Sequence, residues 1–208
     1  MTIEEILALS PVMPVVTISD ASLAVPLARA LLAGGVRTME ITLRTPQALA
    51  AVRAIVREVP DAVVGVGTVV TAQDLSDAAG AGAAFAVSPG SSPSLMAAAK
   101  QSATPLLPGA ATAGEVMAGL ELGYRAFKFF PAAHIGGVAA LASFAGPFPM
   151  VRFCPTGGID AHNAQSYLAL PNVVCVGGSW ITPAAAIEDG NFEFIEGAAR
   201  DAVAIGQR

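Results

Sequence analysis

A regular alternation of short apolar segments and alanine-rich amphipathic segments is the feature that most constrains the fold of this chain. Eight apolar segments rich in β-branched residues begin 20 to 26 residues apart, near Val12, Thr38, Ala62, Phe85, Pro105, Ala126, Met150 and Val173. The intervening segments have helical periodicity, for example over residues 23–33, 46–58, 72–79 and 113–122. Strands that alternate with helices predict parallel pairing through right-handed crossovers.

Eight such units suit a closed (β/α)₈ TIM barrel, an α/β fold that residues 1–208 would form as a single domain. Residues 1–9 are then expected to form an extra N-terminal helix that covers one end. An open doubly wound sheet is the alternative. That fold often carries a GxGxxG motif after its first strand, whereas the first apolar segment here ends in VVTISD (15–20). The sequence therefore favours the barrel.

Composition and charge argue against several kinds of partner. The net charge is −5 and no Lys/Arg-rich run occurs, so neither a nucleic acid nor an anionic membrane is an expected partner. No apolar run approaches the roughly 18–20 residues of a membrane span, and the acidic N-terminus MTIEEILALS is unlike a signal peptide. Cys154 and Cys175 are expected to be buried free thiols, which favours the cytoplasm. His134 and His162 lack ligand-spaced partners, so no metal site is predicted.

A lysine lies in the middle of the sixth apolar segment, AFKFFPAA (126–133). The chain has nine arginines but only two lysines, Lys100 and Lys128, so lysine is not its usual cation. Because side chains alternate across a strand, Lys128 and Phe130 share one face. A barrel interior would disfavour the charged form of the amine, which predicts a nucleophilic, Schiff-base lysine. The alternative is an anion-binding or snorkelling lysine at the barrel rim.

The second apolar segment, MEITLR (39–44), places Glu40, Thr42 and Arg44 on one face. Glu40 is the only carboxylate within a predicted strand, and a buried glutamate is suited to taking up and returning protons near neutral pH. Arg44, at the end of the strand, is suited to binding a substrate carboxylate through two hydrogen bonds. A structural Glu40–Arg44 ion pair is the alternative.

Glycine-rich motifs end four of the predicted strands. TGG (156–158) and GGS (177–179) end the seventh and eighth strands, where barrels often hold a phosphate on backbone N–H groups. Ser179 would add a hydroxyl to that site. GVGT (65–68) and SPG (88–90) end the third and fourth strands, where small residues leave room for a ligand and Thr68 can bind a carboxylate. Plain turn formation is the alternative for each motif.

Six motifs together resemble those of the 2-keto-3-deoxy-6-phosphogluconate (KDPG) and 4-hydroxy-2-oxoglutarate (KHG) aldolases: EITLRT (40–45), GVGTV (65–69), SPG (88–90), FKFFPA (127–132), RFCPTGGI (152–159) and GGSW (177–180). The resemblance covers nearly the whole chain. It implies a homotrimeric (β/α)₈ lyase of the Entner–Doudoroff pathway, a class I aldolase that needs no cofactor. Such an enzyme splits KDPG into pyruvate and D-glyceraldehyde 3-phosphate. For several members the resemblance also implies cleavage of KHG into pyruvate and glyoxylate.

The same resemblance implies individual roles. Lys128 would form the imine and Glu40 would be the acid/base. The implied substrate-binding residues run from the pyruvate end to the phosphate end: Arg44, Thr68, Pro89, Phe130, Thr156, Gly157, Gly158 and Ser179. An arginine at Arg44, and none in the first strand, favours the gluconate over the galactonate type. Ala133, followed by His134, stands where the family usually has an acidic residue.

Two other functions remain open from the residues. A metal-independent barrel isomerase or epimerase acting on a sugar phosphate would use the same glycine-rich strand ends, with Lys128 as an electrostatic group only. A non-enzymatic ligand sensor is the third candidate, although no DNA-binding or partner-docking segment is evident. Formation of a covalent imine would separate the aldolase from the isomerase.

Overall fold

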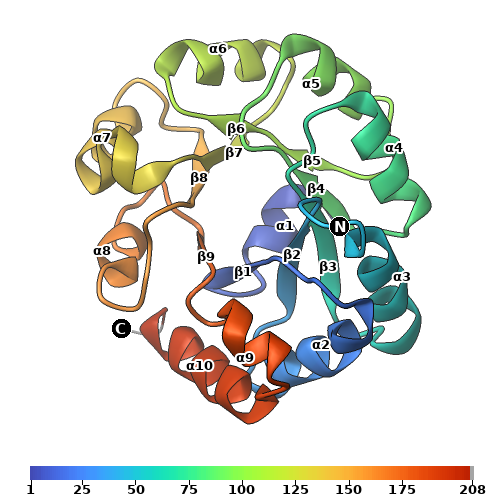
Figure 1. Ribbon diagram of the computed structural model, residues 1–208. Helices are drawn as coiled ribbons and strands as arrows, with labels where there is room; N and C mark the ends of the chain where they lie inside the picture. The colour runs from blue at the N-terminus through green and yellow to red at the C-terminus, as the bar shows by residue number, and fades with distance from the viewer. Residues whose placement is uncertain (207–208) are drawn as a thin grey trace.

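The computed structural model describes residues 1–206, in which strands alternate with helices along the chain (Figure 1). The strands are β1 (Val12–Val16), β2 (Thr38–Thr42), β3 (Val63–Gly67), β4 (Phe85–Val87), β5 (Leu106–Leu107), β6 (Gly109–Ala110), β7 (Ala126–Phe129), β8 (Arg152–Pro155) and β9 (Val176–Gly178). The α-helices are α1 (Ile3–Leu7), α2 (Ala24–Ala33), α3 (Ala48–Glu58), α4 (Ala72–Gly80), α5 (Pro93–Ala99), α6 (Ala113–Glu121), α7 (Gly137–Ala145), α8 (Ala164–Leu168), α9 (Ala184–Glu188) and α10 (Phe192–Ile205). Two 3₁₀-helices, η1 (Ala21–Leu23) and η2 (Ala132–Ile135), lie in the connections.

The strands form two parallel sheets. One has the order β5-β4-β3-β2-β1-β9 and the other the order β6-β7-β8. Isolated parallel bridges, Phe153 with Val173 and Thr156 with Gly177, connect the end of the second sheet to the region of β9. At the other end only Pro108 separates β5 from β6, and its carbonyl accepts a hydrogen bond from the Lys128 N–H at 2.9 Å. Proline has no N–H to donate to a ladder, which accounts for the interruption.

The predicted parallel α/β organisation is confirmed, with small differences at the ends of elements. Each of the eight apolar segments contains a strand, but Pro108 divides the fifth, and the last strand begins at Val176 rather than Val173. In the turn before α8, which begins at Ala164, Asp160 accepts hydrogen bonds from the N–H groups of His162 and Asn163. None of the helices within residues 1–206 is long and apolar enough to cross a membrane.

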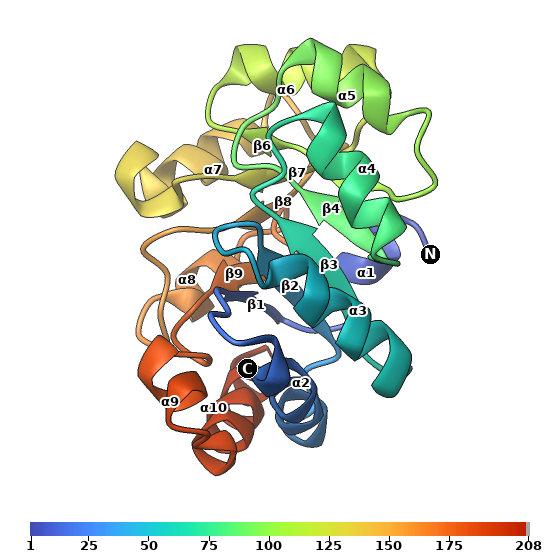
Figure 2. The same ribbon diagram turned by 45° about the vertical axis from the view of Figure 1, so that its right-hand side comes forward.

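Helices surround the strands, and α1 lies in the middle of the strands in Figure 1 and next to β3 and β4 in Figure 2. The apolar side chains of α1 join a buried cluster with Met13, Phe85 and Ala126, residues near the beginnings of their strands. The N-terminal segment is therefore a helix that covers the N-terminal ends of the strands, as expected. The C-terminal ends lie on the opposite side, where catalytic groups of parallel barrels are found.

Alternation along β7 directs its aromatic and charged residues to opposite sides. Phe127 and Phe129 are buried in the layer between strands and helices, and the Phe129 ring packs edge-on against Phe144 of α7 with centroids 5.9 Å apart. Lys128, between them, therefore points to the interior side of the strands. The sequence pattern FKFF thus fixes the direction of the lysine through the burial of its two neighbours.

Candidate active site

Two buried side chains of opposite charge meet inside the strands. Lys128 donates hydrogen bonds from Nζ to Glu40 Oε1 at 3.0 Å and to Glu40 Oε2 at 3.2 Å. The two side chains are only 6% and 3% exposed, so water cannot solvate either charge well. Removing either partner would leave the other charge buried without compensation. The alternative of a Glu40–Arg44 ion pair is wrong, because the Glu40 carboxylate pairs with Lys128.

A glycine of the neighbouring strand makes space for the carboxylate. Gly67 of β3 pairs with Thr42 of β2, and a Cβ atom built on Gly67 would overlap Oε1, Cγ and Cδ of Glu40. A Cβ on Gly65 would likewise overlap the ring of Phe85. The glycines of GVGT therefore make room for side chains of this protein, whereas the sequence pattern suggested room for a ligand.

We predict that, if Glu40 takes part in a reaction, Gly67→Ala lowers kcat/KM by about 10²-fold, because displacing a reacting group by about 1 Å can have this effect. Overpacking is also expected to reduce the free energy of unfolding by about 1–3 kcal/mol. Steady-state kinetics and thermal unfolding measure the two effects. Gly80→Ala is the matched control, since a Cβ there meets nothing within 4 Å. Equal activity of the two variants would contradict the steric role.

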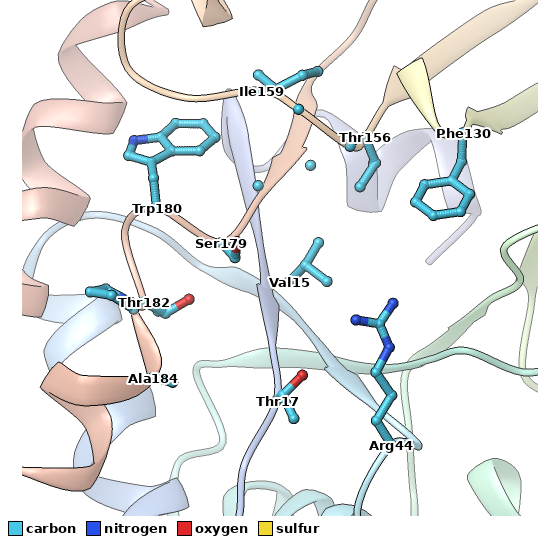
Figure 3. Close-up of a pocket in the computed structure, with 15 residues that line it drawn as sticks. Val15, Thr17, Arg44, Phe130, Thr156, Ile159, Ser179, Trp180, Thr182 and Ala184 are labelled. Atoms are coloured by element: carbon cyan, nitrogen blue, oxygen red, sulfur yellow. The ribbon is translucent and has the colours of Figure 1, made fainter. Parts of the chain in front are cut away.

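A cavity of about 490 Å³ lies beyond the ion pair, between the ends of β1, β2, β7, β8 and β9 (Figure 3). This volume lies within the range of small-molecule sites. Phe130 lines the cavity, and its ring centroid is 5.5 Å from Lys128 Nζ, so it connects the ion pair to the cavity. Arg44 extends its guanidinium into the same space and forms no ion pair with a carboxylate of residues 1–206. A guanidinium at the cavity wall without a carboxylate partner within residues 1–206 is suited to binding an anion.

Most of the residues predicted for the site line this cavity, namely Arg44, Phe130, Thr156, Gly157, Gly158 and Ser179. Thr68 and Pro89 are not among its lining residues. Thr68 directly follows Gly67, which contacts Glu40, and its φ of 62° lies in the left-handed region. The Pro89 backbone packs against Gly109, which pairs with Lys128 in the ladder. Thr68 thus adjoins the glycine that makes room for Glu40, and Pro89 packs against the strand partner of Lys128.

The glycine-rich end of β8 has a conformation that other residues rarely adopt. Gly157 and Gly158 have φ values of 101° and 71°. A Cβ on Gly157 would also press against Pro131 and the Phe130 ring. Consecutive turns of this kind expose backbone N–H groups and can form a concave anion site. Ser179, after β9, adds an exposed hydroxyl to the same cavity.

Several residues that line the cavity were not predicted from the sequence. Thr17 at the end of β1 and Thr182 after β9 are the polar ones. Thr182 is 4% exposed, and its hydroxyl has no hydrogen-bond partner within residues 1–206. Trp180 is apolar in the cavity wall and packs against Gly178. Thr17 could have been predicted, because functional residues of parallel barrels lie at the C-terminal ends of the strands and Thr17 follows the first strand.

The two thiols are buried away from the cavity and are not disulfide-bonded, as expected. The pKa of the Cys175 thiol is raised well above its usual range. The largest cause is a hydrogen bond with Cys154, followed by burial and by the charge of the Cys154 thiolate. Cys175 is therefore protonated near neutral pH. This state does not suit a nucleophile, since the thiolate is the reactive form.

Comparison with known proteins identifies one family. The family model of the KDPG and KHG aldolases matches residues 3–198. The 2-dehydro-3-deoxy-phosphogluconate aldolase of Dickeya dadantii (strain 3937) is 53% identical over 201 residues, which cover 97% of this chain and 94% of the relative. The KHG/KDPG aldolase of Escherichia coli (strain K12) is 52% identical over 200 residues, with 96% and 94% covered.

A solved structure agrees over almost the whole chain. It is that of the KDPG aldolase from Legionella pneumophila, with pyruvate captured at low pH as a covalent carbinolamine intermediate. The two structures have a TM-score of 0.95 at 47% sequence identity, and the match covers 96% of this chain and 97% of that one.

Proposed function

The chain belongs to the KDPG and KHG aldolase family, and on this premise we propose the substrate and the role of each residue. It is a lyase that cleaves a carbon–carbon bond by class I, Schiff-base chemistry. The substrate is KDPG, which yields pyruvate and D-glyceraldehyde 3-phosphate, and the smaller keto acid KHG yields pyruvate and glyoxylate. The buried contact between Lys128 and Glu40, beside a cavity with an anion-binding wall, is the observation that carries this proposal.

The first step forms the imine. Glu40 takes a proton from the Lys128 ammonium along their 3.0 Å hydrogen bond, which leaves the net charge of the buried pair unchanged. The neutral amine attacks the C2 ketone, and one amine proton moves to the ketone oxygen to give a carbinolamine. The proton held by Glu40 then joins the carbinolamine hydroxyl, which departs as water. The products of this step are an iminium ion on Lys128 and a Glu40 carboxylate.

The second step breaks the C3–C4 bond. Glu40 takes the proton of the C4 hydroxyl, the bond electrons move to the iminium nitrogen, and the aldehyde departs from an enamine. Glu40 then returns its proton to C3, and water hydrolyses the pyruvyl iminium to release pyruvate. General acid–base help of this kind contributes about 10²–10⁴-fold to the rate.

The positions of the other residues suggest how the substrate lies. The keto-acid carboxylate binds Arg44, with Thr68 and Pro89 beside the pyruvyl group and Phe130 over the imine. The phosphate lies on the backbone of Gly157 and Gly158, with the Ser179 hydroxyl. Thr156 lies between the two ends. Two observations support these assignments: the Arg44 guanidinium lines the cavity without an ion pair within residues 1–206, and the positive-φ residues Gly157 and Gly158 line the same cavity.

We also propose that residues 1–208 form one closed (β/α)₈ domain that assembles as a homotrimer in the cytoplasm. The bridge between Thr156 and Gly177 and the single-residue gap at Pro108 support closure of the barrel.

Gln207 and Arg208 lie outside the described residues. Light scattering tests the assembly, with an expected mass of about three times the 20.9 kDa of one chain. The two free thiols fit a reducing compartment.

Borohydride reduction in the presence of pyruvate tests the covalent mechanism. We expect a stable pyruvyl adduct on Lys128, located by mass spectrometry of proteolytic peptides. Lys100 is an internal control, because it is exposed and its Nζ lies 4.2 Å from the Tyr124 ring centroid, away from the cavity. An adduct on Lys100 only, or no adduct at all, would refute the Schiff base and would favour an isomerase or epimerase.

A further inference from the structure

We propose that Thr17 is a specificity-determining residue that accepts a hydrogen bond from the C5 hydroxyl of the substrate, the hydroxyl next to the phosphate-bearing carbon. The inference rests on the proposed function and adds to it a contact that favours KDPG over KHG. A pair of threonines on neighbouring strands, Thr17 and Thr42, is the observation behind it.

Thr17 presents its side chain to the substrate cavity. It follows the last residue of β1, is exposed and lines the cavity wall. In the β1–β2 ladder Val15 lies opposite Glu40, so Thr17 lies about one pleat further towards the C-terminal mouth than the catalytic carboxylate. Figure 3 shows the Thr17 hydroxyl and the Arg44 guanidinium extending into the same space.

The hydrogen bonds of Thr42 determine the direction of the Thr17 hydroxyl. Thr42 is fully buried, and its Oγ1 lies 3.0 Å from the carbonyl oxygen of Val16, which can only accept. Thr42 therefore donates its single proton to Val16. The same Oγ1 lies 3.0 Å from Thr17 Oγ1, so Thr17 must be the donor of that second bond. With its proton committed, Thr17 offers only acceptor lone pairs to the cavity.

Because the Thr17 hydroxyl can only accept a hydrogen bond from the substrate, it can bind only a substrate group that donates one. Carboxylate and ionised phosphate oxygens have no proton to donate to Thr17. The C4 hydroxyl is committed to Glu40 during cleavage. The C5 hydroxyl of KDPG is then the remaining donor of the bound substrate. KHG carries a carboxylate at C5, which would place an acceptor against the acceptor of Thr17.

A cycle of two substrates and two enzymes tests the contact. We expect that Thr17→Val, which is isosteric, lowers kcat/KM for KDPG by about 3- to 10-fold, the effect of one neutral hydrogen bond. Removing the C5 hydroxyl in 5-deoxy-KDPG should lower kcat/KM of the unaltered enzyme by a similar factor. Combining both changes should cause little further loss, because both remove the same bond. Thr17→Ser, which keeps the hydroxyl, should restore KDPG cleavage to within about twofold.

Thr42→Val provides a second readout that a merely structural role would not produce. This isosteric change removes the acceptor for the Thr17 proton, so Thr17 becomes able to donate to a carboxylate. The ratio of kcat/KM for KHG to that for KDPG is expected to rise by about 3- to 10-fold.

The role of Thr17 would be refuted if the losses of kcat/KM caused by Thr17→Val and by 5-deoxy-KDPG were independent and multiplied when combined. It would also be refuted if the ratio of kcat/KM for KHG to that for KDPG were unchanged in Thr17→Val and in Thr42→Val. These results differ from a failure of the proposed function. If the unaltered enzyme forms no borohydride adduct with pyruvate, the aldolase mechanism itself fails, and the inference about Thr17 fails with it. An adduct and KDPG cleavage without coupling to Thr17 would refute this inference alone.

Discussion

Replacing Lys128 with arginine is expected to lower kcat/KM for KDPG cleavage by at least about 10⁴-fold, as loss of a catalytic nucleophile does in other enzymes. Arginine keeps the positive charge beside Glu40 but stays protonated, so it cannot form the imine. The substitution therefore separates nucleophilic catalysis from electrostatic stabilisation. Release of pyruvate from KDPG measures the effect, and circular dichroism and thermal unfolding report whether the fold is retained.

Lys100→Arg is the matched control for this experiment, because Lys100 is the other lysine of the chain and is exposed at the end of α5. We expect it to cleave KDPG at the rate of the unaltered enzyme. Turnover of Lys128→Arg within about tenfold of the unaltered enzyme would mean that charge alone is needed at this position. That outcome would favour the isomerase or epimerase mechanism over the aldolase.

Replacing Glu40 with glutamine is expected to have the second-largest effect, a loss of about 10²–10⁴ in kcat/KM for KDPG. The amide cannot take the C4 proton or return a proton to the enamine. The same variant should slow the exchange of pyruvate methyl protons with deuterated water by a comparable factor, as measured by proton NMR. Exchange at the unaltered rate would place the acid/base on another residue.

The Glu40 variant needs a stability control, because it also removes the partner of a buried ammonium. Breaking such a pair commonly costs about 3–5 kcal/mol, although the glutamine oxygen can still accept one hydrogen bond from Lys128. Denaturant unfolding measures this cost separately from the kinetics. Glu58→Gln, at an exposed ion pair with Arg57, is the matched substitution and should change neither stability nor activity appreciably.

The alternation of apolar and polar residues predicted the helices and strands well, because the interactions that form them involve residues close together in the sequence. Burial of alternate apolar residues and helix capping act over a few positions, as in the capping box between Thr112 and Glu115 at the start of α6. Lys128 and Glu40 were identifiable for a related reason, since a charged residue within an otherwise apolar strand is visible in the sequence. Pro108 shows the limit, because one residue without an N–H divides a strand that the apolar pattern makes continuous.

Contacts between segments that are distant in the sequence could not be predicted from local patterns. Side-chain alternation predicted Glu40 and Arg44 on one face of a strand, with an ion pair between them as one alternative, but β2 ends at Thr42 and Arg44 lies in the turn that follows. The structure pairs Glu40 with Lys128 instead, 88 positions along the chain, and leaves Arg44 to the cavity. Likewise, no pattern in β1 or β2 shows that the hydroxyls of Thr17 and Thr42 meet.

The sequence by itself determined the order of strands and helices, the face that Lys128 shares with Phe130, and the presence of one lysine and one carboxylate within apolar strands. These follow from side-chain alternation and from the cost of burying charge, which depend on near neighbours. Only the tertiary structure decided which carboxylate pairs with Lys128, which glycine makes room for that carboxylate, and that the Thr17 hydroxyl donates its proton to Thr42. Those outcomes depend on the register between strands far apart in the chain, and register is fixed by packing of the whole sheet rather than by any one segment.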